Sequence, residues 1–538
     1  MRAETLAAAR ADRVWDLAVI GGGATGLGVA LDAAARGFSV VLFESDDFAK
    51  GTSSRATKLV HGGVRYLAQG NVTLVREALH ERATVLANAP HLAQPLAFVM
   101  PAYHFWEAPF YGIGLKMYDA LAGSRGLGAT EFLSAARTRE LLPTVQPRGL
   151  SGGVKYWDGQ FDDARLAVAL ARTAAAKGAL VLNHCPVTGL IREGGKITGL
   201  VARDAGFGKD GGSELRIAAK CVVNATGVWV DDLRNMDREP GTSATPGIVA
   251  PSQGVHLVVD RAFLPGTHAL LVPKTEDGRV LFAVPWLGKT ILGTTDTPRA
   301  DVVREPTPFA EEVQFILRES ARHLSKAPAR GDVRSVWVGL RPLVKPGGAD
   351  SEGEAGVNTK KLSREHTVLV GRSGLVTVTG GKWTTYRAMA EDVLDQCFDR
   401  GLLSRRAGGV TVHLPLVGAP ATANVPITAS PGEHLYGSEA DTLRSLPGAT
   451  RWLWHDAESG QGGLSEAMVR FAARFEMALG VEDVLARRSR LLFLDAAEAA
   501  RQAGAVAAIL ADELGAGFDA PASQRSFEAL AKQYQTLP

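Results

Sequence analysis

The 538-residue chain has few cysteines: only Cys185, Cys221 and Cys397 occur, far apart in the sequence and without a C-x-x-C pair. An odd, scattered set of cysteines is typical of buried free thiols in a reducing compartment, and it favours neither a disulfide framework nor a zinc site. We therefore expect three free thiols and no bound metal ion.

The sequence also lacks an uninterrupted apolar run of the ~18 residues that a membrane-spanning helix requires. Residues 1–16 are too charged for a signal peptide. The 59 Lys and Arg residues almost balance the 57 Asp and Glu residues, which argues against a broad nucleic-acid-binding surface. We expect a cytoplasmic protein with no transmembrane segment and no nucleic-acid partner, which at most associates peripherally with the cytoplasmic face of the inner membrane.

A glycine-rich stretch near the N-terminus is the strongest local signal. Residues 17–20 are a short apolar run, and residues 21–26 follow as G-x-G-x-x-G. A helix of small residues comes next and stops at Gly37, and residues 39–43 predict a second strand. Strand, glycine turn, helix and strand in this order predict a Rossmann-type dinucleotide-binding unit.

Each residue of this unit has a physical role toward a dinucleotide. Gly21 permits the tight turn, Gly23 lets the backbone approach a pyrophosphate, and Gly26 lets the helix pack close to the strand. The helix N-terminus at Ala24 offers N–H groups and a partial positive charge to the diphosphate. Glu44 ends the second strand and can accept both ribose hydroxyls, which favours an unphosphorylated adenosine ribose.

Two later stretches favour FAD over NAD. Residues 221–233 are an apolar strand that ends in Ala-Thr-Gly, and residues 374–392 are a strand, a Gly-Gly pair and a helix. Both place a glycine at the carboxyl end of a strand, where ligands bind in open α/β sheets. A cofactor as long as FAD needs such contacts from distant segments. A second G-x-G-x-x-G at residues 206–211 has alternating strands around it and no helix after it, so we expect a hairpin loop there.

Several short motifs occur together along most of the chain. They are VIGGGATGLGVALDAAARG, GTSSRATKLVHGGVRYL, YWDGQFDDARL, VVNATGVWVDDL, VPWLGKTILGTTDTP, VGLRPLV, LSREH and GGKWTTYRAMAED, followed by VEDVLARRSRLLFLDAAEAA near the C-terminus. In this content and order the chain resembles the FAD-dependent glycerol-3-phosphate dehydrogenases, within the wider group of amino-acid-oxidase-like flavoproteins. The resemblance implies oxidation of sn-glycerol 3-phosphate to dihydroxyacetone phosphate, with hydride passing to FAD.

The resemblance also implies a fold that combines α/β and α+β parts. We expect a discontinuous Rossmann-type FAD-binding domain (1–90, 150–235 and 360–395) and an antiparallel-sheet substrate-binding domain (91–149 and 236–359). A C-terminal α-helical domain (396–538) should follow, with a linker after Gly401 and amphipathic helices that include residues 468–479 and 481–514.

The expected FAD contacts come from the glycine turn, the TSSRATKL stretch, and the later strand ends. They are Gly21, Gly23, Ala24, Gly26, Glu44, Thr52, Ser53, Ser54, Lys58, Leu59, Gly62, Val187, Ala225, Gly227, Gly381 and Thr384.

Oxidising a secondary alcohol needs a hydride acceptor and a base. The flavin accepts the hydride, and histidine is the usual side chain for taking a proton near neutral pH. His61 lies in HGG, directly after the TSSRATK stretch, and is the expected base; the alternative is a histidine that only packs against the flavin. Arg341 and Lys382 are expected to stabilise the developing alkoxide.

A phosphomonoester carries close to two negative charges, so it needs several cationic donors. Arg65 and Tyr66 in GGVRY are expected to reach the phosphate, and Arg364 in LSREH is a further cationic candidate. Thr294 either binds the substrate or only completes its own turn, and the sequence favours neither reading.

Other functions remain open on the same residues. The protein could be a glycerol-3-phosphate oxidase that uses O2, an amino-acid or amine oxidase, or a flavin-bound protein without turnover. Four cationic candidates exceed what an amino-acid substrate with one carboxylate needs. The electron acceptor is expected to be a quinone or a similar acceptor, and the C-terminal helices could form a homodimer interface.

Residues 95–123 are dense in aromatic side chains. They could form a surface at a bilayer interface or the wall between two domains. Because only Lys116 is basic between residues 94 and 121, little positive charge is available for anionic lipid, and the wall is favoured.

Overall fold

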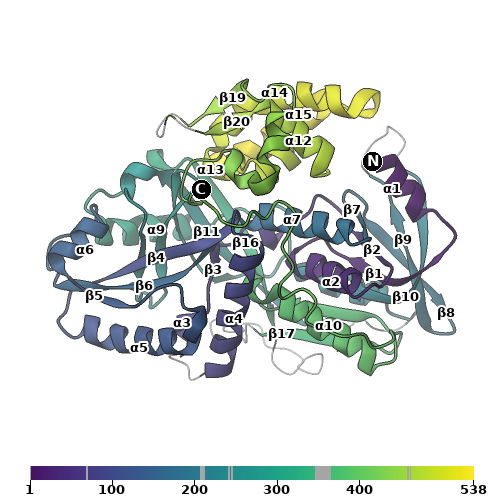
Figure 1. Cartoon of the computed structure of the whole chain (residues 1–538), viewed down its shortest axis with the longest axis horizontal. Helices are drawn as coiled ribbons and strands as arrows, with labels where there is room; N and C mark the ends of the chain where they lie inside the picture. Colours follow the sequence, from purple (N-terminus) through teal and green to yellow (C-terminus); the bar gives the residue numbers. More distant parts are fainter. Residues whose placement is uncertain are drawn as a thin grey trace.

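The computed structural model describes residues 2–67, 71–205, 212–239, 241, 243, 246–345, 365–456, 460 and 462–538. Two large β-sheets lie side by side, and the C-terminal helices cover the region above them (Figure 1). The mixed α/β fold with its C-terminal helices agrees with the expected fold class.

The first sheet has eight strands and contains the Rossmann unit. Five of its strands are parallel, in the spatial order β7, β2, β1, β10 and β18, and three antiparallel strands extend it. The bounds are β1 (Val14–Ile20), β2 (Val40–Phe43), β7 (Leu180–Leu182), β8 (Val187–Glu193), β9 (Lys196–Arg203), β10 (Glu214–Asn224), β17 (His366–Val370) and β18 (Val376–Gly380). β9 and β10 pair antiparallel on both sides of residues 206–211, which themselves lie outside the described residues.

This sheet is buried on both faces, as parallel sheets generally are. Leu17 and Val19 of β1 face a core shared with several helices, whereas Ala18 and Ile20 face a second core. The helices on the first face are α2 (Ala24–Ala35), α7 (Asp163–Ala176) and α10 (Tyr386–Asp399), and α1 (Arg2–Ala9) lies with the β8–β10 strands on the other.

The second sheet has ten strands and is antiparallel except where β12 meets β4. Its strands are β3 (Leu59–Val60), β4 (Ala93–Ala102), β5 (Glu131–Ser134), β6 (Gly152–Phe161), β11 (Val249–Asp260), β12 (Ala269–Val272), β13 (Leu281–Trp286), β14 (Lys289–Gly293), β15 (Thr297–Pro298) and β16 (Ser335–Val344). The associated helices are α3 (Val64–Leu67), α4 (Val72–Asn88), α5 (Glu107–Ala122), α6 (Ala135–Leu141) and α9 (Ala310–His323). The helix α8 (Val230–Met236) follows β10 and contacts β18 of the first sheet.

The C-terminal part is helical with one small two-stranded sheet. It contains α11 (Ala440–Arg444), β19 (Trp452–His455), β20 (Gly463–Ser465), α12 (Glu466–Phe475), the π-helix η10 (Asp483–Arg488), α13 (Leu491–Leu494), α14 (Ala496–Leu514) and α15 (Ala520–Gln535). Residues 481–514 do not form one helix, because the backbone turns left-handed at Arg490 (φ +65°). The helices share a continuous core with Trp286 and Trp337 of the second sheet.

The expected domain boundaries differ from the structure in three places, two of them in strand pairing and one in the extent of a helix. β6 pairs with β4 along its whole length, from Ala93↔Phe161 to Ala102↔Gly152, so residues 152–161 belong to the second sheet and not to the FAD-binding part. β3 pairs with β6 as well. The boundary after residue 395 falls inside α10, whose last turn still packs in the Rossmann core. Pairing partners of this kind are decided by contacts between distant segments and leave no local sequence signal.

All three cysteines are buried free thiols, as expected. None of the helices within the described ranges is both long enough and apolar enough to cross a bilayer.

Candidate functional site

The glycine-rich turn connects β1 to α2 and tolerates no side chains. Gly21 has φ +111°, and a Cβ atom there would lie 2.5 Å from the Ala225 carbonyl oxygen. A Cβ atom at Gly26 would lie 2.0 Å from the Gly21 carbonyl oxygen. Gly23 is the N-cap of α2 and supplies no side-chain hydrogen bond, so the first turn of the helix can direct N–H groups toward a diphosphate.

Glu44 stands directly after β2 and is half-buried. Its carboxylate accepts the N–H groups of Gly22 at 2.6 Å and Asp46 at 2.9 Å. Burial, which these N–H groups offset only in part, raises the pKa of the Glu44 carboxyl. The carboxylate is therefore held at the edge of the glycine turn, where an adenosine ribose would lie in a Rossmann unit.

The loop from Thr52 to Lys58 lies between the glycine turn and the second sheet. The Ser53 hydroxyl accepts the Ala24 N–H at 2.9 Å, and the Thr52 hydroxyl donates to the Leu340 carbonyl oxygen at 2.6 Å. The loop thus connects the start of α2 with β16.

The Lys58 side chain lies beneath this loop, against the loop's own backbone and α7. Its ammonium is fully buried and donates to the Asp163 carboxylate and to the Ser54 carbonyl oxygen, each at 2.7 Å. Burial lowers the pKa of Lys58 to about 7, although Asp163 opposes the shift. The ammonium is thus paired with α7, and a contact between Lys58 and FAD stays a prediction.

The later strand ends meet the same turn. The Ala225 N–H donates to the Ile20 carbonyl oxygen at 2.9 Å, and Thr379 donates to the Gly227 carbonyl oxygen at 3.1 Å. Gly381 follows β18 with φ +74°. Segments from four parts of the chain therefore surround one glycine-lined cradle, and this arrangement fits a long dinucleotide such as FAD.

Three other expected cofactor contacts lie at the margins of this cradle. Leu59 is a buried residue of β3, and Gly62 donates its N–H to the Tyr118 hydroxyl at 2.8 Å. Val187 starts β8, and the Cys185 N–H two residues earlier donates to the Glu44 carbonyl oxygen at 2.7 Å.

The expected base, His61, is joined to the turn that follows β18. Its backbone N–H lies 3.2 Å from the Thr384 hydroxyl, and its carbonyl oxygen lies 3.3 Å from the same hydroxyl. Lys382 is the N-cap of the short helix η8 (Trp383–Thr385). His61 and Lys382 therefore belong to two adjoining backbone segments.

Arg341 lies on β16 opposite Ser252 of β11. Its guanidinium donates to the Thr294 hydroxyl at 3.3 Å, the Thr295 carbonyl oxygen at 2.9 Å and the Gln253 carbonyl oxygen at 3.2 Å. The structure thus brings together Arg341 and Thr294, which lie 47 positions apart. Thr294 contacts a candidate catalytic residue as well as completing its own turn.

Sequence reasoning missed a histidine beside these groups. His256 is 2% exposed, approaches the Thr57 hydroxyl at 2.9 Å through Nε2, and stacks on Trp337 with ring centroids 5.2 Å apart. Burial and the nearby Lys58 and Arg341 charges hold its pKa well below the usual value. His256 occurs in an apolar alternating strand sequence, which gives no signal of a polar role.

Three expected phosphate contacts remain predictions from sequence. The backbone of Arg65 and Tyr66 forms part of α3. Their side chains, and all of Arg364, lie outside what the structure describes.

The chain matches known protein families and several characterised relatives. The family profile described as FAD dependent oxidoreductase matches residues 16–387, and that of the C-terminal domain of alpha-glycerophosphate oxidase matches residues 409–519. The mitochondrial glycerol-3-phosphate dehydrogenase of Homo sapiens is 41% identical over 507 residues, covering 89% of this chain and 68% of that protein. A mitochondrial glycerol-3-phosphate dehydrogenase of Arabidopsis thaliana is 41% identical over 550 residues, covering 94% of this chain and 84% of that protein.

A solved structure shows the same relationship. The glycerol-3-phosphate dehydrogenase of Bacillus halodurans, complexed with FAD, superposes with a TM-score of 0.75 and 30% identity over 99% of this chain and 98% of that chain. The expected cofactor, FAD, is confirmed by the family. This chain belongs to the FAD-dependent oxidoreductases and, within them, to the family of the glycerol-3-phosphate dehydrogenases.

Proposed function

We propose that this protein oxidises sn-glycerol 3-phosphate to dihydroxyacetone phosphate with FAD as the hydride acceptor. The observation that carries the proposal is the Arg341–Thr294 pair beside the Thr52–Lys58 loop. Thr52 of that loop is bonded to Leu340, the residue before Arg341. A planar guanidinium fork with a neighbouring hydroxyl suits an oxyanion or phosphate group held next to a flavin.

Different side chains are assigned to proton removal, charge stabilisation and phosphate binding. His61 takes the proton from the secondary hydroxyl. Arg341 and Lys382 stabilise the negative charge that develops on that oxygen. FAD, when bound, accepts the hydride from the carbon that bears this hydroxyl. Loss of one hydride and one proton converts the alcohol to the ketone. Arg65, Tyr66 and Arg364 are assigned to the phosphate on sequence grounds.

Anaerobic reduction of the bound flavin tests the proposal. The purified yellow protein is mixed with sn-glycerol 3-phosphate in the absence of oxygen, and the visible flavin absorbance is followed. Bleaching with this substrate, and none with unphosphorylated glycerol, is the expected result. A flavin that stays oxidised would overturn the substrate assignment while leaving the FAD fold intact, and amino acids would then be tested. Readmitting oxygen separates an oxidase, which regains its colour rapidly, from a dehydrogenase.

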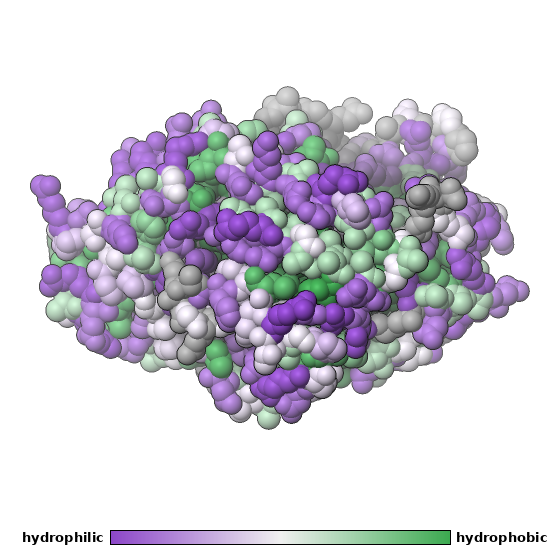
Figure 2. Space-filling model, turned by 90° about the horizontal axis from the view of Figure 1, so that it is seen from above, coloured by the Kyte–Doolittle hydropathy of each residue, from purple (hydrophilic) through white to green (hydrophobic). Residues whose placement is uncertain are grey.

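We further propose that the electron acceptor is a membrane quinone, reached from the cytoplasmic face of the membrane through α5. The outer side of α5 and the residues before it carry large exposed apolar side chains: Phe105 is 89%, Phe110 67% and Ile113 63% exposed. These exposed residues do not form the interdomain wall that was favoured from sequence. By contrast, the face over the C-terminal helices is covered largely by hydrophilic residues with smaller apolar groups between them (Figure 2).

The inner side of α5 is joined to the candidate site. Tyr118 is 1% exposed, accepts the Gly62 N–H at 2.8 Å, and donates to Asp158 at 2.8 Å. One helix therefore separates the exposed apolar side chains from the HGG segment, which supports electron transfer from the flavin to an acceptor dissolved in the membrane. An apolar helix face of this kind suits an interfacial position.

Vesicle binding tests this second proposal. The double variant Phe110→Ser and Ile113→Ser should lose binding to phosphatidylethanolamine–phosphatidylglycerol vesicles and should reduce a long-chain quinone more slowly, with unchanged reduction of a soluble dye. The matched control replaces the exposed Val410 and Val425 by serine and should retain both properties. Equal vesicle binding by both double variants, or no binding by the wild type, would refute the role of α5.

The expected homodimer stays a prediction.

A further inference from the structure

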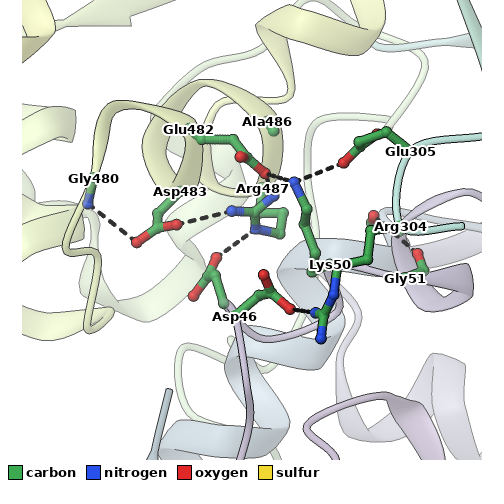
Figure 3. A network of polar contacts seen from close by, with 12 residues as sticks. Asp46, Lys50, Gly51, Arg304, Glu305, Gly480, Glu482, Asp483, Ala486 and Arg487 are labelled. Atoms are coloured by element: carbon green, nitrogen blue, oxygen red, sulfur yellow. Dashed lines mark hydrogen bonds and ion pairs between the residues drawn. The ribbon is translucent and has the colours of Figure 1, made fainter. Parts of the chain in front are cut away.

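The C-terminal helical domain reaches into the FAD-binding half through a short arginine-rich segment, Arg487 to Arg490. Arg487 donates to Glu482 at 2.7 Å and Asp483 at 2.8 Å within its own domain, and Arg488 donates to Asp47 of the Rossmann half at 3.0 Å. Figure 3 shows the neighbouring contact, in which Lys50 points between Glu482 and Glu305. These ion pairs join the two parts along the edge of the Thr52–Lys58 loop.

Arg490 reaches deepest and contacts this loop directly. Its side chain is 0% exposed, and its NH2 group donates at 2.9 Å both to the Ser54 carbonyl oxygen and to the Asp163 carboxylate. Its NH1 group donates to the Ala486 carbonyl oxygen at 2.7 Å, which orients the guanidinium. The π-helical turn and the left-handed Arg490 break the helix at this point, and such irregular turns frequently occur at functional sites.

Asp163 and Lys58 complete a buried triad with Arg490. One oxygen of the Asp163 carboxylate accepts Lys58 at 2.7 Å and the Ala56 N–H at 3.1 Å, while the other accepts Arg490. The Ser54 carbonyl oxygen accepts both cations. Two charges held in one geometry by a fully buried carboxylate leave the backbone from Ser54 to Lys58 little freedom.

Ser53, the residue before Ser54, connects this ordered loop to the glycine turn. Ser53 accepts the Ala24 N–H through its hydroxyl at 2.9 Å and the Trp383 ring N–H through its carbonyl oxygen at 2.8 Å. Ser53 is thus bonded both to the start of α2 and to the turn after β18. Ser54, the next residue, is the one that Arg490 and Lys58 hold.

We propose that Arg490 is a positioning residue for FAD: with Asp163 and Lys58 it orders the Thr52–Lys58 loop from the C-terminal domain, so that Ser53 and the start of α2 are in place before the cofactor binds. The proposal depends on FAD lying against the glycine turn, but it does not depend on the substrate. The C-terminal domain is then part of the cofactor site, although none of its residues needs to touch FAD.

Cofactor affinity tests the proposal independently of turnover. FAD is removed, and rebinding is measured by the change in flavin fluorescence. Arg490→Gln should raise the Kd for FAD by about tenfold to a hundredfold, the effect of losing a charge-assisted hydrogen bond. Arg490→Lys, which keeps the charge, should restore part of the affinity. The double variant Arg490→Gln and Asp163→Asn should lose less free energy of FAD binding than the sum of the losses in the two single variants, because both residues act on one loop.

Arg165→Gln is the matched control. Arg165 is also buried and also joins α7 to the C-terminal domain, through Glu476 and the Arg488 carbonyl oxygen, each at 2.9 Å, but it does not touch the loop. This variant should lose thermal stability while its Kd for FAD stays within about twofold of the wild type. Equal weakening of FAD binding by both variants, or wild-type affinity in Arg490→Gln, would overturn the proposal.

Hydrogen exchange on the wild-type protein keeps the test decisive if Arg490→Gln does not fold. Amides of residues 52–58 should be protected in the protein without FAD nearly as strongly as in the holoprotein, because the triad orders them beforehand. Protection that appears only when FAD is added would show that the cofactor, and not the triad, orders this loop.

Discussion

Arg341 donates to the Thr294 hydroxyl at 3.3 Å across the intervening strand β11, and Gly254 of β11 makes this crossing possible. A Cβ atom on Gly254 would lie 2.3 Å from the Arg341 NH2 group and 2.7 Å from the Thr294 hydroxyl oxygen. The guanidinium therefore occupies the space that a side chain at position 254 would take.

We expect Gly254→Ala to displace the Arg341 guanidinium and to lower kcat/KM for sn-glycerol 3-phosphate by about tenfold to a hundredfold, the cost of a misplaced charge-assisted hydrogen bond. The FAD content should not change, because Gly254 does not line the glycine turn. The control is Gly331→Ala, since nothing lies within 4 Å of a Cβ atom there. Steady-state kinetics with a soluble dye provides the measurement, and wild-type kinetics in Gly254→Ala would contradict the role of Arg341.

Replacing His61 by Gln should slow flavin reduction without releasing the flavin. Loss of a positioned general base typically costs about 10²–10⁴-fold in rate, while the backbone bonds of His61 to Thr384 do not depend on the imidazole. Stopped-flow bleaching under anaerobic conditions measures the rate. His455→Gln, on an exposed residue of β19, is the control. A bleaching rate within about threefold of the wild type would mean that His61 only packs against the flavin.

Gly26→Ala should abolish stable FAD binding. The added methyl group would lie 2.0 Å from the Gly21 carbonyl oxygen, and only movement of α2 away from β1 can relieve that contact. Gly114→Ala on α5 is a matched change within a helix, with no atom inside 4 Å of the new Cβ, and it should stabilise the protein by up to about 1 kcal/mol. The ratio of flavin to protein absorbance after purification distinguishes the two variants. A wild-type ratio in Gly26→Ala would mean that the FAD diphosphate does not lie at this turn.

The contact between His184 and Asp483 should make stability depend on pH. Burial favours the neutral ring, but the carboxylates of Asp483 and Asp47 outweigh it and raise the pKa of His184; Nε2 lies 3.0 Å from Asp483. The folded state then binds a proton more tightly than the unfolded state. The stabilisation is fully present below the unfolded pKa of about 6.5 and is lost as the pH rises through the folded pKa.

Urea denaturation of the holoprotein at pH 6 and pH 8.5 measures this effect against His184→Gln. The wild type should exceed the variant in midpoint at pH 6, and the difference should shrink at pH 8.5. An equal difference at both pH values would show that the imidazole contributes only packing or a neutral hydrogen bond.

Parts of the site could be predicted because their chemistry is local. Gly26 must be glycine because a Cβ atom there would meet the Gly21 carbonyl oxygen of the same βαβ unit. The Asp162 side chain caps α7 by accepting the Arg165 N–H at 3.1 Å. In contrast, Lys58 was assigned to FAD from its position in a motif. Its ammonium pairs with Asp163, 105 positions away, and no local sequence pattern indicates this partner.

The Rossmann unit could be predicted because it depends on residue types at short spacings, and the family because its motifs are themselves short. The FAD cofactor followed from the glycine turn together with the strand ends at residues 221–233 and 374–392. Three other features depend on contacts between distant segments and were not predicted: β6 joins the second sheet, Arg341 crosses β11 to Thr294, and Arg490 holds the loop beside the glycine turn. The physical reason is the same in each case. A strand or an arginine can satisfy its hydrogen bonds with many partners, and folding selects the partner that the packing of distant segments leaves within reach.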